Sequence, residues 1–502
     1  MFAVPLLSLL IFLPLGGGLL ALACGARVRA ARGTALVVSL VELGLTSGLL
    51  ALAGSPQAGQ GAWLLSESRA WLPALGIQYA LGLDGVSLLL VLLTALLQVL
   101  CVLVSWRQID ERPGLYYLLL LLMQTGVNGL FLAQDLFLFY LFWELQLIPM
   151  FFLVGMWGHE RRVFASFKLV LFTLAGSLML LLGILGLYAA HGAQSGTYTF
   201  SLAALAAAPP AANIQGWLMA AMLIGFAVKV PLVPLHTWLP EAHTQAPTAG
   251  SVLLAGVLLK TGAYAIFRVA LPVLPSAAAL AAPVLVGLAL AGVFYAAWIA
   301  RAQRDLKRLV AYSSITHLGL VVLGLAAWNL MSVSGAVLQM INHGLSTSAL
   351  FILAGLLQQR LDSRSLEDMG GLWTAMPRFS AFFLFFAMAS LGLPGLNNFV
   401  GELLVLLGTY RAYPAAAVAG FVGLAVGVMY VLKMVQATIF GPAQPGPPPP
   451  DLNGREALIL GVLAVAVLFI GLHPGPVLEL IEGPVKALMS PGQQVALAIF
   501  QP

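Results

Sequence analysis

Lysine side chains lie where the sequence is otherwise apolar, and these lysines are the first indication of chemistry. Lys229 and Lys260 fall in two consecutive apolar runs, and Pro231 and Pro234 interrupt the first run. A charged side chain at the centre of a membrane-spanning helix costs about 2.5–3.5 kcal/mol, so an ionisable group there is by default a functional candidate. Because a buried lysine can release its proton whereas arginine practically cannot, both positions favour proton transfer through a membrane.

The composition indicates a polytopic membrane protein. The chain has 502 residues, of which 61% are hydrophobic and 8% charged, whereas globular proteins carry roughly 25% charged residues. The net charge of +5 does not indicate nucleic acid, because the basic residues cluster in short loops. Two cysteines, Cys24 and Cys101, cannot supply the four ligands of an iron–sulfur cluster. With no phosphate-binding loop, dinucleotide fingerprint or catalytic triad, we expect no cofactor in this chain.

Apolar windows of about 20 residues predict an all-α fold with fourteen membrane-spanning helices. The seventh contains Pro231 and Pro234, and the twelfth contains Leu393-Pro394-Gly395, so we expect both to be broken. Segment 191–213 is expected outside the membrane. The predicted spans are 4–24, 34–54, 83–105, 114–132, 135–157, 167–190, 214–236, 249–271, 277–299, 306–328, 332–357, 379–409, 415–439 and 456–473.

The ionisable groups repeat at equal intervals. Glu144, Lys229 and Lys260 are separated by 85 and 31 residues, and the same intervals separate His317, Glu402 and Lys433. The two triads fall on spans five, seven and eight and on spans ten, twelve and thirteen. Each unit would therefore contain five helices: the fourth to eighth spans form one unit, and the ninth to thirteenth spans form the other. An odd number of helices per unit places the two copies in opposite orientations, as in many transporters.

This repeat predicts four segments along the chain. An N-terminal three-helix segment covers 1–112, and the two five-helix repeats cover 113–272 and 273–440. Residues 441–502 hold a proline-rich linker, the last span and a tail. We expect this tail, interrupted by glycine and proline from about residue 474, to lie along the surface.

Loop charge predicts the orientation in the membrane, because cytoplasmic loops are enriched in lysine and arginine. One set of loops holds sixteen basic residues and the opposite set holds four. The first set is therefore expected to be cytoplasmic, with both termini on the periplasmic or lumenal side. The opposite set is Arg69, Arg268, Arg411 and Lys486. The cytoplasmic set is Arg27, Arg29, Arg32, Arg107, Arg112, Arg161, Arg162, Lys168, Arg301, Arg304, Lys307, Arg308, Arg360, Arg364, Arg378 and Arg455.

We predict that Glu144 in span five pairs with Lys229. The desolvation cost of each ion is offset only by an opposite partner, and separating the pair would let the lysine lose its proton. Lys260 would be the next acceptor. A protonated Glu144 that satisfies one backbone group, and a structural Lys260, are the alternatives.

Histidines continue the series because histidine titrates near neutral pH. His317 and His343 lie at the centres of spans ten and eleven, with polar neighbours. Each could instead be a hydrogen-bonded core residue. Glu402, which follows the break in span twelve, is the expected terminal donor towards the outside. Lys433 is either a relay or a side chain that reaches towards the membrane surface.

A polar elbow follows the prolines of span seven and carries His236, Glu241 and His243. The spacing of seven residues between the histidines is not a recognised metal-ligand geometry, so we expect no metal site. Proton uptake from the cytoplasm through His236 and His243 is the preferred interpretation. Glu42 in span two has no role in this scheme.

Several motifs give a resemblance to a known family. They are FYLFWELQLIPMFFLVGMWG, PLHTWLPEAHTQAPTAGSVLLAGVLLKTGAY, AYSSITHLGLV, INHGLSTSALFILAGLL, MGGLW and LPGLNNFVGE. Together they resemble the antiporter-like proton-pumping membrane subunits of complex I, of the M or chain 4 type. The resemblance covers nearly the whole chain.

The resemblance implies fourteen helices with inverted five-helix repeats, a Glu144–Lys229 pair, a central relay of Lys260 and His317, and Glu402 as terminal group. Lys433 is not part of the family pattern. The implied function is proton translocation in the membrane arm of an NAD(P)H or ferredoxin:quinone oxidoreductase, in a bacterial inner membrane or a thylakoid. Quinone, flavin and iron–sulfur clusters would belong to partner subunits. Expected partners are neighbouring antiporter-like subunits, the lateral helix of an L-type subunit and lipids. A multisubunit Na+(cation)/H+ antiporter is the alternative.

Overall fold

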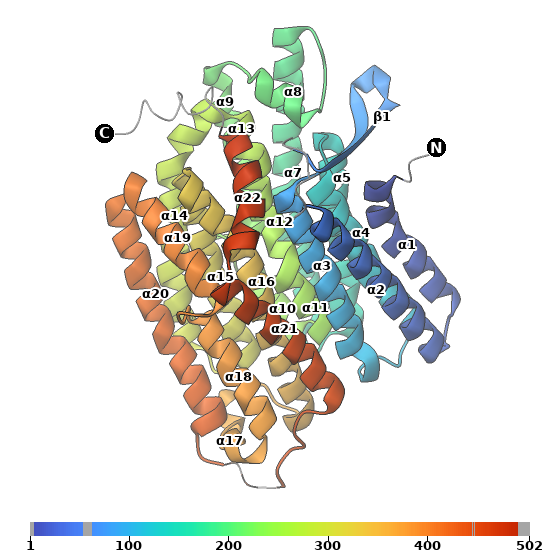
Figure 1. Cartoon of the computed structure of the whole chain (residues 1–502), viewed down its shortest axis with the longest axis vertical. Helices are drawn as coiled ribbons and strands as arrows, with labels where there is room; N and C mark the ends of the chain where they lie inside the picture. The colour runs from blue at the N-terminus through green and yellow to red at the C-terminus, as the bar shows by residue number, and fades with distance from the viewer. Residues whose placement is uncertain (1–4, 54–62, 444, 446, 490–502) are drawn as a thin grey trace.

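The structure, a computed structural model, describes residues 5–53, 63–443, 445 and 447–489. Helices stand side by side in one bundle, and most run along its long axis (Figure 1). Within these residues, thirteen helices are long and apolar enough to cross a membrane. Helices are expected in a bilayer because every backbone polar group must find its partner inside the chain.

The helices of the first half follow the predicted spans closely. The eighth span consists of five consecutive elements, from α11 to α13, because two π-helical turns (η3 and η4) interrupt its α-helix. The elements are α1 (Leu6–Ala23), α2 (Val28–Ala53), α3 (Gly85–Val104), α4 (Pro113–Leu132), α5 (Leu136–Leu145), α6 (Leu147–Trp157), α7 (Arg162–Ser195), α8 (Leu202–Ala207), α9 (Ala212–Lys229), α10 (Trp238–Gln245), α11 (Thr248–Leu253), η3 (Leu254–Leu258), α12 (Leu259–Ala265), η4 (Ile266–Ala270) and α13 (Leu271–Val273).

The second half agrees equally well with the predicted spans. Short 3₁₀ turns lie at Pro73–Leu75, Ser105–Arg107 and Leu366–Asp368, and a π-helical turn ends α20 at Gln436–Phe440. The helices are α14 (Pro275–Ala302), α15 (Leu306–Ala326), α16 (Leu330–Leu361), α17 (Leu372–Ala375), α18 (Pro377–Ser390), α19 (Asn397–Ala412), α20 (Pro414–Val435), α21 (Gly454–Leu472) and α22 (Gly475–Leu488).

Both predicted helix breaks are present. The seventh span ends as α9 at Lys229, and an irregular segment, 230–237, leads into α10. The twelfth span is divided into α18 and α19, and the six residues between them include Leu393-Pro394-Gly395. Gly392 and Gly395 adopt φ angles of +74° and +91° in this break, a region that glycine occupies without strain. The broken twelfth span is not among the thirteen long apolar helices, and adding it gives the fourteen predicted spans. The all-α polytopic fold class is confirmed.

Two features differ from the expectations. β1 (Leu65–Leu72) and β2 (Ile77–Leu83) form an antiparallel hairpin between spans two and three, which the sequence analysis did not predict. The predicted tail is not interrupted at Gly475, Gly483 and Pro484 but forms the continuous helix α22, Gly475–Leu488, and its last residues, 490–502, lie outside the described residues. One face of α22, with Val477, Ile481 and Val485, is buried where the helix contacts α3 and α16.

Three spans form the centre of the bundle: α11–α13, α15 and α16. Every residue in the most apolar stretch of each is buried, whereas the outer α7 and α14 bury fewer than half of theirs. Polar side chains on the three central spans are therefore shielded from lipid by other helices, and they contact one another across the helix interfaces.

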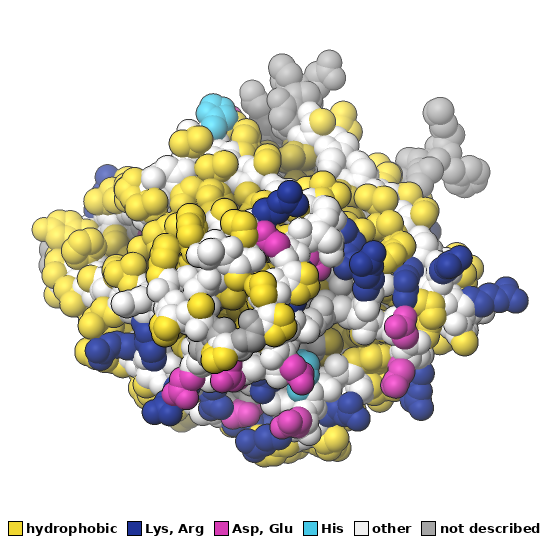
Figure 2. Space-filling view, turned by 90° about the horizontal axis from the view of Figure 1, so that it is seen from below, with side chains coloured by type: hydrophobic (Ala, Val, Ile, Leu, Met, Phe, Trp, Pro, Cys, Tyr) yellow, Lys and Arg dark blue, Asp and Glu magenta, His cyan; other side chains and the backbone are white. Residues whose placement is uncertain are grey.

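The two ends of the bundle differ. In Figure 1, α17 lies at the lower end, and α8 and β1 lie at the upper end. Seen from below, Lys, Arg, Asp and Glu side chains are spread over the lower end of the molecule (Figure 2). The loops of the basic set belong to this end, as an alternation of fourteen spans requires.

Arg268 is not in a loop, contrary to the sequence analysis. It lies in η4, is 6% exposed, and forms an ion pair with Asp84, the residue that caps the N-terminus of α3. Its guanidinium also lies 5.0 Å from the centre of the Trp63 ring. The predicted span 249–271 includes Arg268, but the loop-charge count assigned this residue at the end of the span to the adjacent loop; the pair is buried inside the upper end of the bundle.

Lys307 was likewise assigned to a loop, and this assignment is also wrong. It lies in the first turn of α15 and is 1% exposed. Lys307 is therefore enclosed by the bundle, as are Lys229 and Lys260.

The Arg268–Asp84 pair predicts a large loss of stability when one partner is removed. Replacing Arg268 by methionine leaves the Asp84 carboxylate buried without its partner, which costs about 3–5 kcal/mol. Thermal unfolding of the purified membrane protein is expected to show a clearly lower Tm. The exposed Arg304–Glu367 pair, at 3.2 Å, is the control, since Arg304→Ala should change stability by about 0–1 kcal/mol. Equal melting temperatures for both variants would contradict the buried-pair assignment.

Candidate proton-transfer site

The central contact of the site joins Lys260 to His343. Lys260, on α12, is fully buried, and its Nζ lies 2.7 Å from Nδ1 of His343, on α16. The same amine donates to the backbone oxygen of Ala255. The amine and the ring nitrogen are thus within direct proton-transfer distance.

The backbone of the eighth span makes this contact possible. A π-helical turn, rare and often found at functional sites, precedes Lys260 and contains Ala255. Gly256 of that turn lies against Gly344 of α16, where an added Cβ on Gly344 would come within 2.9 Å of the Gly256 carbonyl oxygen. The two helices approach closely because both residues lack side chains, and this brings His343 next to Lys260.

His343 leads on to His317. The two imidazole rings, on α16 and α15, have their centroids 5.5 Å apart. Nε2 of His343 is buried and has no hydrogen-bond partner among the residues that the structure describes. This nitrogen is therefore free to exchange a proton with a neighbour.

His317 in turn contacts Glu402. Nδ1 of His317 lies 3.3 Å from Oε1 of Glu402, within ion-pair range although not in hydrogen-bond orientation. On its other side, Nε2 lies 3.4 Å from Oγ of Ser390, and Gln339 Nε2 donates to Glu402 Oε1 at 3.3 Å. We call Lys260, His343, His317 and Glu402 the central row.

The break in the twelfth span positions Glu402. A Cβ built on Gly392 would lie 2.3 Å from Oε2 of Glu402, so a larger residue at this turn would displace the carboxylate from its observed position. The break therefore turns the chain and also leaves the space into which Glu402 extends.

Glu144 and Lys229 do not form a contact pair. Lys229 is buried, and its Nζ lies 4.9 Å from the centre of the Trp143 ring and has no hydrogen-bond partner within the described part of the chain. Glu144 lies near the end of α5, and its buried Oε1 also lacks a partner. No oxygen of Glu144 comes within 4 Å of the amine, and Glu144 is the carboxylate whose charge acts on Lys229. The cation–π contact with Trp143 stabilises the ammonium in place of a direct ion pair.

The two histidines of the elbow contact different elements. His243 is fully buried on α10 and stacks on Phe351 of α16, with ring centroids 4.3 Å apart and neither nitrogen hydrogen-bonded. His236 lies in segment 230–237 and meets Tyr295 of α14 edge to face at 5.2 Å. Only His243 is placed towards the central helix that carries His343.

Lys433 lies outside the central row. Its Nζ donates to the backbone oxygens of Arg301 and Gln303, at 2.7 and 2.9 Å, and so caps the C-terminal end of α14. A cation is favourable there because the last carbonyls of a helix carry partial negative charge. The equal spacing in the sequence therefore does not give Lys433 the environment of Lys260.

Glu42, unassigned by the sequence, is buried between helices near the N-terminus. Asn128 Nδ2, on α4, donates to its Oε1 at 2.9 Å and to the backbone oxygen of Leu10 at 2.8 Å. Glu42 therefore takes part in a contact that links α1, α2 and α4, and none of its hydrogen bonds involves the central row.

Gln339, Ser390 and Trp143 were not among the predicted site residues. Gln339 lies four residues before His343 and hence on the same face of α16, so helical spacing could have indicated it. Ser390 ends α18 directly before the predicted break. Trp143 precedes Glu144, but no sequence pattern shows that its ring faces Lys229.

The fold and the site define a class: a polytopic membrane protein that encloses a connected series of lysine, histidine and glutamate side chains. Residues 133–427 match the family described as NADH:quinone oxidoreductase/Mrp antiporter, TM. The chain belongs to this family.

Individual relatives agree with this assignment. Subunit M of NADH-quinone oxidoreductase from Pseudomonas aeruginosa is 47% identical, over 84% of this chain and 84% of that protein. A chain of respiratory complex I from Thermus thermophilus superposes with a TM-score of 0.86 at 33% identity, covering 96% of this chain and all of that one. A chain of the Mrp complex from Dietzia sp. superposes with a TM-score of 0.85 over 98% of this chain and 99% of that one; at 22% identity it shows the fold alone.

The contact between Gly392 and Glu402 predicts a selective loss of function. Gly392→Ala and Gly395→Ala both force alanine into positive φ, at a cost of about 1–2 kcal/mol each. Only the Gly392 variant also displaces the Glu402 carboxylate, because the nearest atom to a Cβ on Gly395 is 3.8 Å away. We expect similar stability losses but reduced proton pumping only in Gly392→Ala, measured by fluorescence quenching in membrane vesicles. Equal pumping in the two variants would argue against a role for the Glu402 position.

Proposed function

We propose that this chain translocates protons as a membrane-arm subunit of an NADH:quinone oxidoreductase complex. The observation that carries the proposal is the central row, in which Lys260, His343, His317 and Glu402 follow one another across three helix interfaces. Four groups that can gain or lose a proton stand in sequence inside a protein core that is shielded from lipid.

The geometry supports a stepwise transfer. The ammonium of Lys260 gives its proton to Nδ1 of His343, and the amine is then ready to be reloaded. His343 passes a proton through Nε2 to His317, which delivers it to the carboxylate of Glu402. Each transfer moves a charge by one neighbour at a time, so no group must carry an uncompensated charge far through a low-dielectric interior.

Glu144 and Lys229 form the second part of the proposal, a switch. In this structure the two side chains are apart and the lysine rests on Trp143. Approach of the carboxylate would strengthen proton binding by Lys229, and separation would weaken it. The break directly after Lys229 gives this side chain a local hinge. Movement of Glu144 relative to Lys229 is thus the step at which energy from the rest of the complex would act.

The energy source belongs to other subunits. The relatives are named as parts of NADH-quinone oxidoreductase, and we assign quinone, flavin and iron–sulfur chemistry to the partner subunits of such a complex. Neighbouring antiporter-like subunits and the lateral helix of an L-type subunit are the proposed partners in the membrane. Their contact with this chain would couple quinone reduction to the Glu144–Lys229 switch.

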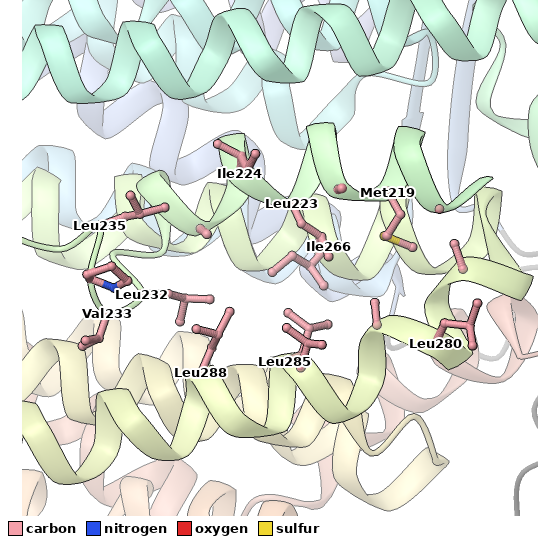
Figure 3. Close-up of a pocket in the computed structure, with 17 residues that line it drawn as sticks. Met219, Leu223, Ile224, Leu232, Val233, Leu235, Ile266, Leu280, Leu285 and Leu288 are labelled. Carbon is pink, nitrogen blue, oxygen red and sulfur yellow. The ribbon is translucent and has the colours of Figure 1, made fainter. Parts of the chain in front are cut away.

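Lipids are further proposed partners. An apolar groove of about 400 Å³ lies between α9 and α14 beside the break in span seven (Figure 3). Its lining is apolar side chains such as Leu223, Leu232 and Leu285, and none of the central row is among them. The groove fits an acyl chain, and not a charged substrate.

We also propose an orientation in the membrane and an internal repeat. Placing the basic lower end of the bundle in the cytoplasm, and both termini on the periplasmic or lumenal side, follows the enrichment of lysine and arginine in cytoplasmic loops. The membrane would be a bacterial inner membrane or a thylakoid. Spans 4–8 and 9–13 would be inverted copies, preceded by the segment 1–112 and followed by 441–502. Helix breaks in the seventh and twelfth spans support this division.

A subunit of a multisubunit cation/proton antiporter is the second candidate, because the family includes Mrp antiporters and the fold of the Dietzia chain is the same. Purification of the native assembly separates the two candidates. Flavin and iron–sulfur subunits would support the first, and small antiporter subunits without redox centres would support the second.

The switch predicts the behaviour of two alanine variants. Glu144→Ala and Lys229→Ala are expected to assemble into the complex but to abolish proton pumping, because neither leaves a pair that can change the lysine's proton affinity. Pumping and quinone reduction are measured together in inverted membrane vesicles. Lys168→Ala, at a lysine that lies against Phe164 in the first turns of α7, is the control and should pump normally. Normal pumping by both Glu144 and Lys229 variants would rule out the switch.

A further inference from the structure

A polar depression opens on the lower end of the bundle, directly over buried ionisable groups. Its volume is about 540 Å³, and it lies between the α6–α7 loop, the α14–α15 loop and the end of α16. Its lining residues are His159, Glu160, Arg304, Asp305, Gln358, Asp362, Ser363, Arg364 and Ser365. Water therefore has access to the elements that surround the first turn of α15.

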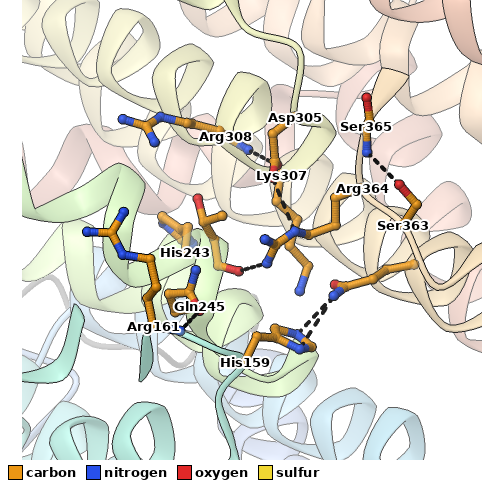
Figure 4. Close-up of polar contacts among 12 residues, drawn as sticks. His159, Arg161, His243, Gln245, Asp305, Lys307, Arg308, Ser363, Arg364 and Ser365 are labelled. Atoms are coloured by element: carbon orange, nitrogen blue, oxygen red, sulfur yellow. Dashed lines mark hydrogen bonds and ion pairs between the residues drawn. The ribbon is translucent and has the colours of Figure 1, made fainter. Parts of the chain in front are cut away.

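Lys307 lies beneath this depression. Its side chain is 1% exposed and extends from α15 towards His159 (Figure 4). Its Nζ donates a long hydrogen bond, 3.4 Å, to the backbone oxygen of Ala246. The lysine also stands in the first turn of a helix, where the partial positive charge of the helix end disfavours a cation.

The acidic groups nearby are already engaged by arginines. Asp305 caps the N-terminus of α15 by accepting from the Arg308 N–H, and its other oxygen lies 3.1 Å from Nε of Arg364. Glu241 lies 3.4 Å from Nη2 of Arg308. In the part of the chain that the structure describes, no carboxylate comes within 4 Å of the Lys307 amine. Lys307 is therefore a buried amine without an ion-pair partner.

On the side of the depression, Lys307 faces His159. Burial lowers the pKa of His159 to about 4, and the positive charges of Lys307 and Arg364 contribute to this shift. The ring is therefore neutral at physiological pH, and it accepts a hydrogen bond from Gln358 Nε2 at 3.2 Å. A neutral imidazole beside the amine can pass a proton inwards from water in the depression.

On the inner side, Lys307 faces His243. The Ala246 carbonyl that accepts from Lys307 lies at the end of α10, the helix that carries His243. Both ring nitrogens of His243 are buried and lack a hydrogen-bond partner among the described residues, and the charges of Lys307 and Lys260 act on the ring. His243 thus stands between the amine under the depression and the first member of the central row.

We propose that Lys307 is a further proton-transfer residue, which loads protons from the polar depression and delivers them through His243 to Lys260. Neither amine is hydrogen-bonded to His243, so each transfer passes through an intervening water molecule. The ammonium of Lys307 gives a proton in this way to a ring nitrogen of His243, which becomes an imidazolium. The imidazolium gives a proton to the deprotonated amine of Lys260, and the amine of Lys307 takes a new proton from the depression. This route rests on the proposed function, since it supplies the same central row.

A purely structural Lys307 would serve to cap the Ala246 carbonyl. Lys307→Arg separates the two roles, because arginine keeps a donor and a positive charge but cannot deprotonate. Lys433→Arg is the matched control, since Lys433 also donates to backbone carbonyls at a helix end. Lys307→His is a second variant, since histidine exchanges protons near neutral pH. The intact complex is tested in membrane vesicles for assembly, quinone reduction and proton pumping.

A positioned proton-transfer group contributes about 10²–10⁴-fold to a rate, so we expect Lys307→Arg to pump at least about tenfold more slowly. Lys433→Arg should pump normally, and Lys307→His should recover part of the rate. Normal pumping by Lys307→Arg would overturn the proposal. Failure of both Lys307 variants to assemble would also overturn it, by assigning a structural role. Lys260→Arg distinguishes the two proposals, because its normal pumping would refute the central row itself.

Discussion

The free-energy cost of holding an ionisable group away from water is the constraint on which this structure depends. An isolated charge in a low-dielectric interior is strongly disfavoured, so it must be neutral, paired or hydrogen-bonded. The bundle satisfies this condition by placing Lys260, His343, His317 and Glu402 next to one another on helices that other helices enclose. Each group can give a proton to its neighbour or take one from it. The arrangement that keeps these groups stable in the interior therefore also provides a path for protons.

Departures from regular helix geometry bring these groups together. A π-helical turn and the contact of Gly256 with Gly344 set Lys260 against His343. The break in span twelve provides Gly392, over which the Glu402 carboxylate fits. Irregular backbone is tolerated at membrane depth only where protein or water surrounds it, and here it lies at the helices of the central row. The irregularities therefore mark the sites at which side chains must approach more closely than regular helices allow.

The spans and both helix breaks were predictable from the sequence, because long apolar runs and proline or glycine inside them have few alternatives in a bilayer. The contact of Lys260 with His343 was not, since it depends on the close approach of two glycines from distant parts of the chain. Arg268 and Lys307 lie at the ends of the predicted spans 249–271 and 306–328 but were counted with the loops, because the sequence does not show whether a charge at a helix end is buried or exposed. For Lys433, the equal spacing in the sequence suggested that this residue is equivalent to Lys260. Its contacts with backbone oxygens at the end of α14 do not support this equivalence.

The enclosed cations divide by residue type in a way that follows from their chemistry. Arg268, Arg360 and Arg364 each lie within 4 Å of a carboxylate, and as permanent cations they hold helix ends and loops together. Lys229, Lys260 and Lys307 have no such partner in the described part of the chain, and their amines contact an aromatic ring, an imidazole or backbone oxygens instead. A carboxylate partner would hold each lysine in its charged form. Its absence leaves the amines able to alternate between charged and neutral, as proton transfer requires.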